Sequence, residues 1–116
     1  MAYKEVTREQ YLAALRSGDY LQTTGATFRA KNAYTPECFC ALGVLDEIAG
    51  VPRLTYAYHD IPESELYDFV PEEVAIKLGL SPALVKDIEQ WNDWEGLNFS
   101  EIADRLEETW NEQPTT

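Results

Sequence analysis

Apolar residues recur along this chain at the three- and four-residue spacing of amphipathic helices. The most apolar stretch is residues 38–50, in which the spacing predicts a central helix that begins near Cys40 and ends at Gly50. Neighbouring apolar residues extend the buried surface around this helix, so we expect burial on more than one side. The residues on its main apolar face are Leu42, Leu45, Ile48 and Ala49.

Start and stop signals predict four further helices. A capping box at 7–10 opens a helix that ends at 17–18, and a proline at 71 opens one that ends at Gly79. Ser81-Pro82 repeats the start signal, and a box at 98–101 opens a last helix whose apolar stripe reaches Trp110.

Residues 26–30 and 54–58 alternate in polarity, as half-buried strands do. The turn-rich segment 31–36 would return the chain so that 37–39 pairs with the first of these strands, whereas 19–25 reads as a polar connector. We therefore predict an α+β fold in a single small domain, residues 1–116. It would hold about five helices packed with a short antiparallel β-hairpin or three-stranded sheet, with a polar tail from about residue 111.

Composition places the 116-residue chain among ordinary globular proteins, with 45% hydrophobic and 26% charged residues. Its net charge of −12 is unevenly distributed. Six basic residues balance six acidic ones in residues 1–58, whereas residues 59–116 hold three basic and fifteen acidic residues. The acidic half would repel nucleic acid and anionic membranes and would attract a basic partner; acidity that only keeps the protein dissolved is the simpler alternative.

Three classes of location or partner are disfavoured. No apolar run is long enough to span a membrane, and the first residues lack the apolar core of a signal peptide, so a cytoplasmic location is expected. No basic stripe is present, so direct binding of nucleic acid is not expected. Self-association through the tyrosines and tryptophans stays open, because their exposure cannot be read from the sequence.

Cys40 is the one candidate for enzymatic chemistry, since a cysteine at a helix start can have a lowered pKa and act as a nucleophile. No base stands near it in the sequence, and a buried apolar cysteine is the competing interpretation. Cys38, Cys40 and His59 are one ligand short of a zinc site. Residues 91–102 fail the calcium-loop pattern at both ends. We predict neither a metal nor a cofactor.

A small-molecule site is a second hypothesis, located in the segment 16–29. Two guanidinium groups, several hydroxyl and amide groups and a glycine would suit a phosphate or carboxylate, although no phosphate-loop or dinucleotide fingerprint is present. The competing interpretation is a connector whose polar side chains satisfy turns. The candidate ligand-binding residues are Arg16, Tyr20, Gln22, Thr24, Gly25 and Arg29.

The acidic helices of the second half suggest a third hypothesis, in which carboxylates bind a basic protein or imitate a phosphate backbone. Solvated outer helix faces are the simpler interpretation. The candidate partner-binding residues are Asp93, Glu101, Asp104, Glu107 and Glu108.

Two motifs stand in the first half of the chain, residues 15–22, LRSGDYLQ, and residues 39–45, FCALGVL. They resemble the opening half of a family of small, uncharacterised acidic proteins of tailed phages and prophages. In the second half, Asn92-Asp93 and residues 99–103, FSEIA, are similar to the closing motifs of that family. The resemblance covers about Leu15 to Glu107. Asp46 stands where relatives often have cysteine, which weakens a shared thiol or metal role.

The resemblance implies a phage accessory protein in the host cytoplasm, a class rich in stoichiometric inhibitors. Combined with the charge distribution, it leads us to expect a non-enzymatic protein that inhibits a host or anti-phage defence protein with a basic surface. The alternatives are a sponge for a nucleotide immune signal, using the segment 16–29, and a thiol-dependent enzyme using Cys40.

Overall fold

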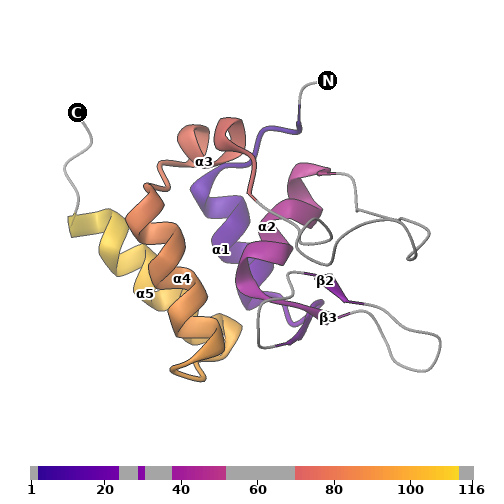
Figure 1. Ribbon diagram of the computed structural model, residues 1–116, viewed down its shortest axis with the longest axis vertical. Helices are drawn as coiled ribbons and strands as arrows, with labels where there is room; N and C mark the ends of the chain where they lie inside the picture. Colours follow the sequence, from indigo (N-terminus) through magenta and orange to yellow (C-terminus); the bar gives the residue numbers. More distant parts are fainter. Residues whose placement is uncertain (1–2, 24–28, 31–37, 52–69, 113–116) are drawn as a thin grey trace, which may run out of the picture.

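The computed structural model describes residues 3–23, 29–30, 38–51 and 70–112, and helix caps fix where its helices begin. This part of the chain contains five helices and three strands of two residues each (Figure 1). The elements in chain order are α1 (Arg8–Arg16), β1 (Leu21–Gln22), β2 (Arg29–Ala30), β3 (Cys38–Phe39), α2 (Ala41–Ala49), α3 (Glu72–Leu78), α4 (Pro82–Asp93) and α5 (Phe99–Glu112).

The predicted ends of α1 and α2 are confirmed. The backbone N–H of Gln10 donates to Thr7 Oγ1 (3.0 Å), and the Gln10 side-chain oxygen accepts from the Thr7 N–H (2.9 Å), which completes the capping box. Cys40 is the N-cap of α2, and Gly50 closes that helix in the left-handed conformation.

The later helices also begin near their predicted start signals. Ser81 caps α4 through its hydroxyl, which accepts from the Leu84 N–H (3.1 Å), and Pro82 is the first helical residue. Asn98 and Glu101 form the reciprocal pair predicted for the start of α5 (2.8 and 3.1 Å). Helix α3 begins one residue later than predicted, because Pro71 is its N-cap.

The sheet differs from the prediction, although the α+β class is confirmed. The antiparallel pairing predicted between residues 26–30 and 37–39 is confirmed as β2 with β3. Strand β1, however, pairs parallel with β3, so the order is β1-β3-β2 and the three-stranded sheet is mixed. The segment 19–25, predicted as a connector, contains β1. Strands β1 and β3 lie far enough apart in the sequence for the crossover that parallel pairing needs. The predicted strand 54–58 lies outside the described residues.

The core lies where α1, α2, α4 and α5 meet. Helix α1 packs against both α2 and α5, and α4 packs against the same two helices, so that α2 has neighbours on more than one side as predicted (Figure 1). Six of the nine residues of α2 are apolar or glycine and fully or nearly fully buried, together with Asp46. The hydroxyl of buried Tyr11 donates to the carbonyl of Ala41 (2.6 Å) and so ties α1 to the start of α2.

Candidate binding surface

Cys40 caps the central helix from inside the core. Its Sγ accepts a hydrogen bond from the Gly43 N–H (3.4 Å), and only 4% of the residue is exposed. Burial raises the pKa of the Cys40 thiol to about 12, so the group is protonated at neutral pH. The lowered pKa expected of a nucleophile is therefore wrong, and the side chain acts as a helix cap. His59 lies outside the described residues.

A buried amide, that of Asn92, holds together the start of α2, the sheet and the end of α4. Its Oδ1 accepts from the Gln22 side chain (2.9 Å) and from the Ala41 N–H (3.2 Å). Its Nδ2 donates to the Thr23 carbonyl (2.8 Å) and to Asp93 Oδ1 (2.8 Å). With 1% of the residue exposed, Asn92 satisfies polar groups that the core would otherwise leave without partners. We call this set the Asn92 network.

The predicted ligand-binding residues do not converge in the described part of the chain. Gln22 belongs to the Asn92 network and also donates to the Leu97 carbonyl (2.7 Å). The ring of Tyr20 packs edge-to-face on Phe39, with centroids 5.1 Å apart. Thr24 and Gly25 lie outside the described residues, and only the backbone of Arg29 is described. The ligand site itself stays a prediction.

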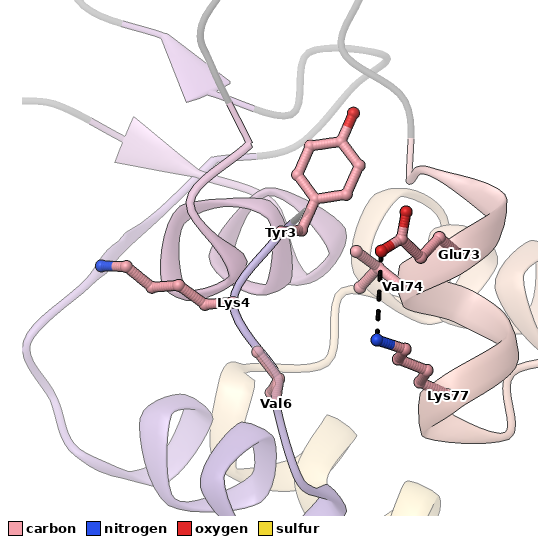
Figure 2. Close-up of a pocket in the computed structure, with 6 residues that line it drawn as sticks. All are labelled: Tyr3, Lys4, Val6, Glu73, Val74 and Lys77. Atoms are coloured by element: carbon pink, nitrogen blue, oxygen red, sulfur yellow. Dashed lines mark ion pairs between the residues drawn. The ribbon is translucent and has the colours of Figure 1, made fainter. Parts of the chain in front are cut away.

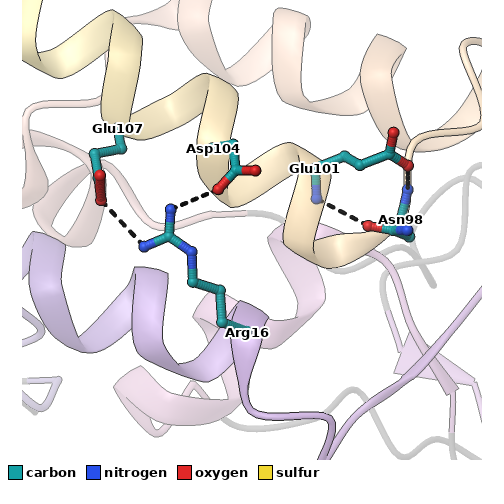
Figure 3. A network of polar contacts seen from close by, with 5 residues as sticks. All are labelled: Arg16, Asn98, Glu101, Asp104 and Glu107. Atoms are coloured by element: carbon teal, nitrogen blue, oxygen red, sulfur yellow. Dashed lines mark hydrogen bonds and ion pairs between the residues drawn. The ribbon is translucent and has the colours of Figure 1, made fainter.

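Arg16 forms ion pairs with carboxylates of α5, far from it in the sequence. One guanidinium nitrogen lies 2.8 Å from an oxygen of Asp104, and the other lies 3.1 Å from an oxygen of Glu107 (Figure 3). These two hydrogen bonds raise the pKa of Arg16 above its ordinary value. One candidate ligand-binding residue is thus paired with two candidate partner-binding residues across the α1–α5 interface.

The other candidate partner-binding residues differ in how far they are engaged. Glu101 completes the N-terminal cap of α5 (Figure 3), and Asp93 accepts from Asn92. Glu108 is exposed and forms no hydrogen bond or ion pair with the residues that the structure describes. Of the five predicted carboxylates, Glu108 is therefore the one that a partner meets without displacing a described intramolecular contact.

A small hollow lies between the segment before α1 and helix α3. Tyr3 and Val6 line one side, and Glu73, Val74 and Lys77 line the other (Figure 2). Its volume of about 10 Å³ is enough for a single water molecule. The Lys77 ammonium lies 3.9 Å from a carboxylate oxygen of Glu73. This hollow is too small for a nucleotide or another organic ligand.

Among the residues that the structure describes, no three His, Cys, Asp or Glu side chains gather in a way that could hold a metal ion. In the same residues, no helix has the length and apolar character needed to cross a membrane. Comparisons with protein-family models, with curated proteins and with solved structures give no match.

Two residues at the C-terminal end of α4, Asn92 and Trp94, were not identified from the sequence as functional candidates. The role of Asn92 depends on partners 51 to 70 positions away, which no local pattern reveals. Trp94 is 86% exposed, the highest exposure among the large apolar side chains of the described residues. Its position between two acids, beyond the apolar stripe of α4, is the sequence signal that could have identified it.

Proposed function

We propose that the chain is a non-enzymatic phage accessory protein that acts by stoichiometric binding. Its acidic second half engages a basic surface of a host or anti-phage defence protein in the host cytoplasm and thereby inhibits that protein. The family resemblance of the sequence suggests the phage origin, and the acidic outer face of α5 supports the mode of binding.

The two faces of α5 are sharply different. Its apolar face is buried against α1 and α4, whereas four carboxylates lie on the opposite face at three- and four-residue spacing. These exposed residues, which we call the α5 acidic face, are Glu101, Asp104, Glu108 and Glu112.

Few basic side chains offset this charge. Residues 70–112 contain eleven acidic and three basic residues. Arg105 lies 3.2 Å from Glu95 and Lys77 lies 3.9 Å from Glu73, whereas burial and nearby Asp93 raise the pKa of Glu89 in spite of the opposing effect of Lys86. The surface therefore keeps a strong negative potential, which speeds association with a basic partner and makes it sensitive to salt.

Charge reversal on the α5 acidic face is the test. We choose Glu108→Lys with Glu112→Lys, because neither residue forms a described cap or ion pair and lysine suits the C-terminal turn of a helix. The bait captures partners from host lysate at about 0.1 M and about 1 M salt, between which the screening length falls from about 10 Å to about 3 Å. We expect a basic host protein to be retained at low salt only, and to be lost with the double variant.

A matched control changes the net charge equally elsewhere. Glu5→Lys with Asp19→Lys alters two exposed residues outside the helices, in the half where charges balance. It should retain the partner. Equal loss with both double variants would mean that only total charge matters, and capture that survives about 1 M salt would remove the electrostatic basis of the proposal.

Sequestration of a nucleotide makes a different prediction. A ligand that binds the folded state must raise the melting temperature, and the rise grows with the logarithm of the ligand concentration above its Kd. A melting scan with cyclic and ADP-ribose-type nucleotides therefore separates the two functions. We expect unchanged melting temperatures, because the described side chains of the 16–29 segment are directed to different parts of the fold.

A further inference from the structure

Two of the three tryptophans carry an arginine over the ring. The guanidinium carbon of Arg8 lies 4.8 Å from the ring centroid of Trp110, and that of Arg105 lies 5.7 Å from the ring of Trp91. A cation over an indole face is attracted by the negative charge of the ring face. Over Trp94, by contrast, no cation lies among the described residues, and 86% of this residue is exposed.

Trp94 stands in an acidic stretch of the chain. It is the C-cap of α4 and donates its N–H to the Gln90 carbonyl (2.9 Å). The last turn of α4 holds no basic residue, so the negative end of the helix dipole is not compensated there. The neighbours of Trp94 in the chain are the acids Asp93 and Glu95.

We propose that Trp94 is the anchor of the binding surface and receives an arginine side chain of the basic partner. This inference rests on the proposed function and adds the position and chemistry of the central contact. The indole face and the carbonyl end of α4 favour a cation beside Trp94. The flanking carboxylates add negative potential, although Glu95 already pairs with Arg105 and Asp93 accepts from Asn92. A large exposed aromatic residue also supplies the apolar area that an acidic surface alone lacks.

Arginine rather than lysine is the expected partner residue. A guanidinium lies flat on an indole ring and at the same time donates to a carboxylate, which a compact ammonium does less well. The molecule contains one example of this arrangement, since Arg105 lies over Trp91 and donates to Glu95 (3.2 Å). The partner would repeat it at the adjacent tryptophan.

The probe for the test is an octa-arginine peptide, added to the ¹⁵N-labelled full chain at low salt. The indole N–H signals of the three tryptophans report on three positions at once. We expect the Trp94 signal to move most, and the Trp110 signal, from a residue that is 5% exposed, to serve as a fixed internal reference. An octa-lysine peptide should bind more weakly and move the Trp94 signal less.

The Trp94→Ala variant should weaken octa-arginine binding about 2- to 5-fold, the range expected for an exposed cation–π contact. Because the side chain is so exposed, the variant should fold normally. Ile76→Ala, at a residue of α3 that is 67% exposed, is the matched control and should leave the affinity unchanged.

Three results would overturn the inference. If octa-arginine binds but the Trp94 signal and the Trp94→Ala affinity stay unchanged, while Glu108→Lys with Glu112→Lys weakens binding, the α5 acidic face acts without Trp94. In that case the proposed function survives and the inference fails. Equal binding and equal Trp94 shifts with octa-lysine would refute the preference for arginine. Absence of binding at low salt would refute both proposals.

Discussion

Replacing Gly79 by alanine should cost far more stability than the same change at other left-handed glycines. Gly79 ends α3 with φ +77°, and a Cβ placed there would overlap the Nη2 atom of Arg8 and lie 3.2 Å from its Cζ. Arg8 cannot move without loss, because its Nε donates to the Leu78 carbonyl (2.9 Å) and its guanidinium lies over Trp110.

Three contributions add up to the loss in the free energy of unfolding that Gly79→Ala should cause. Alanine in the left-handed conformation costs about 1 kcal/mol. Displacing Arg8 adds about 1 kcal/mol for the hydrogen bond and about 0.5–1 kcal/mol for the cation–π contact. Gly18 has nearly the same φ, +79°, and its added Cβ would meet no atom within 4 Å. We therefore expect about 2.5–3 kcal/mol for Gly79→Ala and about 1 kcal/mol for Gly18→Ala.

Urea unfolding of the single variants and of a double variant measures this difference. In the Arg8→Ala background the steric conflict is gone, so Gly79→Ala should cost only the backbone term of about 1 kcal/mol seen at Gly18. The coupling free energy between positions 8 and 79 should then be about 1.5–2 kcal/mol, the part lost when Arg8 is displaced. Equal costs at positions 79 and 18 in the otherwise unchanged protein would refute the reasoning, since Arg8 would then have moved aside freely.

Three further predictions concern the buried and exposed polar groups. Burial keeps the Cys40 thiol protonated in the folded state until its pKa of about 12. Above the unfolded pKa, near 9, this group should therefore lower the free energy of unfolding by about 1.4 kcal/mol per pH unit. In urea unfolding, Cys40→Ala should reduce the slope of this free energy against pH between pH 9 and 10, and an unchanged slope would contradict the assignment. Asn92→Ala should lower the free energy of unfolding by roughly 2–4 kcal/mol, because buried backbone groups lose their partners. The exposed control Gln90→Ala should change it by no more than about 0.5 kcal/mol. Similar melting temperatures of the two variants would argue against the Asn92 network. Arg16→Ala should lower the free energy of unfolding by less than about 1 kcal/mol, and high salt should reduce this loss because it screens the ion pairs of Arg16. A loss that does not depend on salt would indicate that Arg16 stabilises the fold by packing instead.

Local signals in the sequence predicted most of the helical structure. Four helices are capped by a side chain that accepts from the backbone N–H three residues later, and Gly50 ends α2 as expected. The four capping residues are Thr7, Cys40, Ser81 and Asn98. Such signals depend on neighbours three or four positions away, so a single sequence contains them in full.

The remaining features depend on distant partners. The strand β1 exists because it pairs with β3, and its two residues carry little strand pattern of their own. Asn92 is typical of a turn until Ala41 and Gln22 are placed beside it. The same reason explains why Arg16 was interpreted as a ligand-binding residue, since its carboxylate partners lie 88 and 91 positions later.

The packing of α1 against α5 also has a consequence for synthesis on the ribosome. Arg8 reaches Trp110, and Arg16 reaches Asp104 and Glu107, so the first helix completes its contacts only with the last. Helices α4 and α5 are joined by a short turn and can pair early, because local contacts form quickly. Until residue 110 has left the exit tunnel, helix α1 can bury only the part of its apolar face that packs against α2. A nascent chain of this protein therefore keeps part of the apolar face of α1 exposed to chaperones until α5 has emerged.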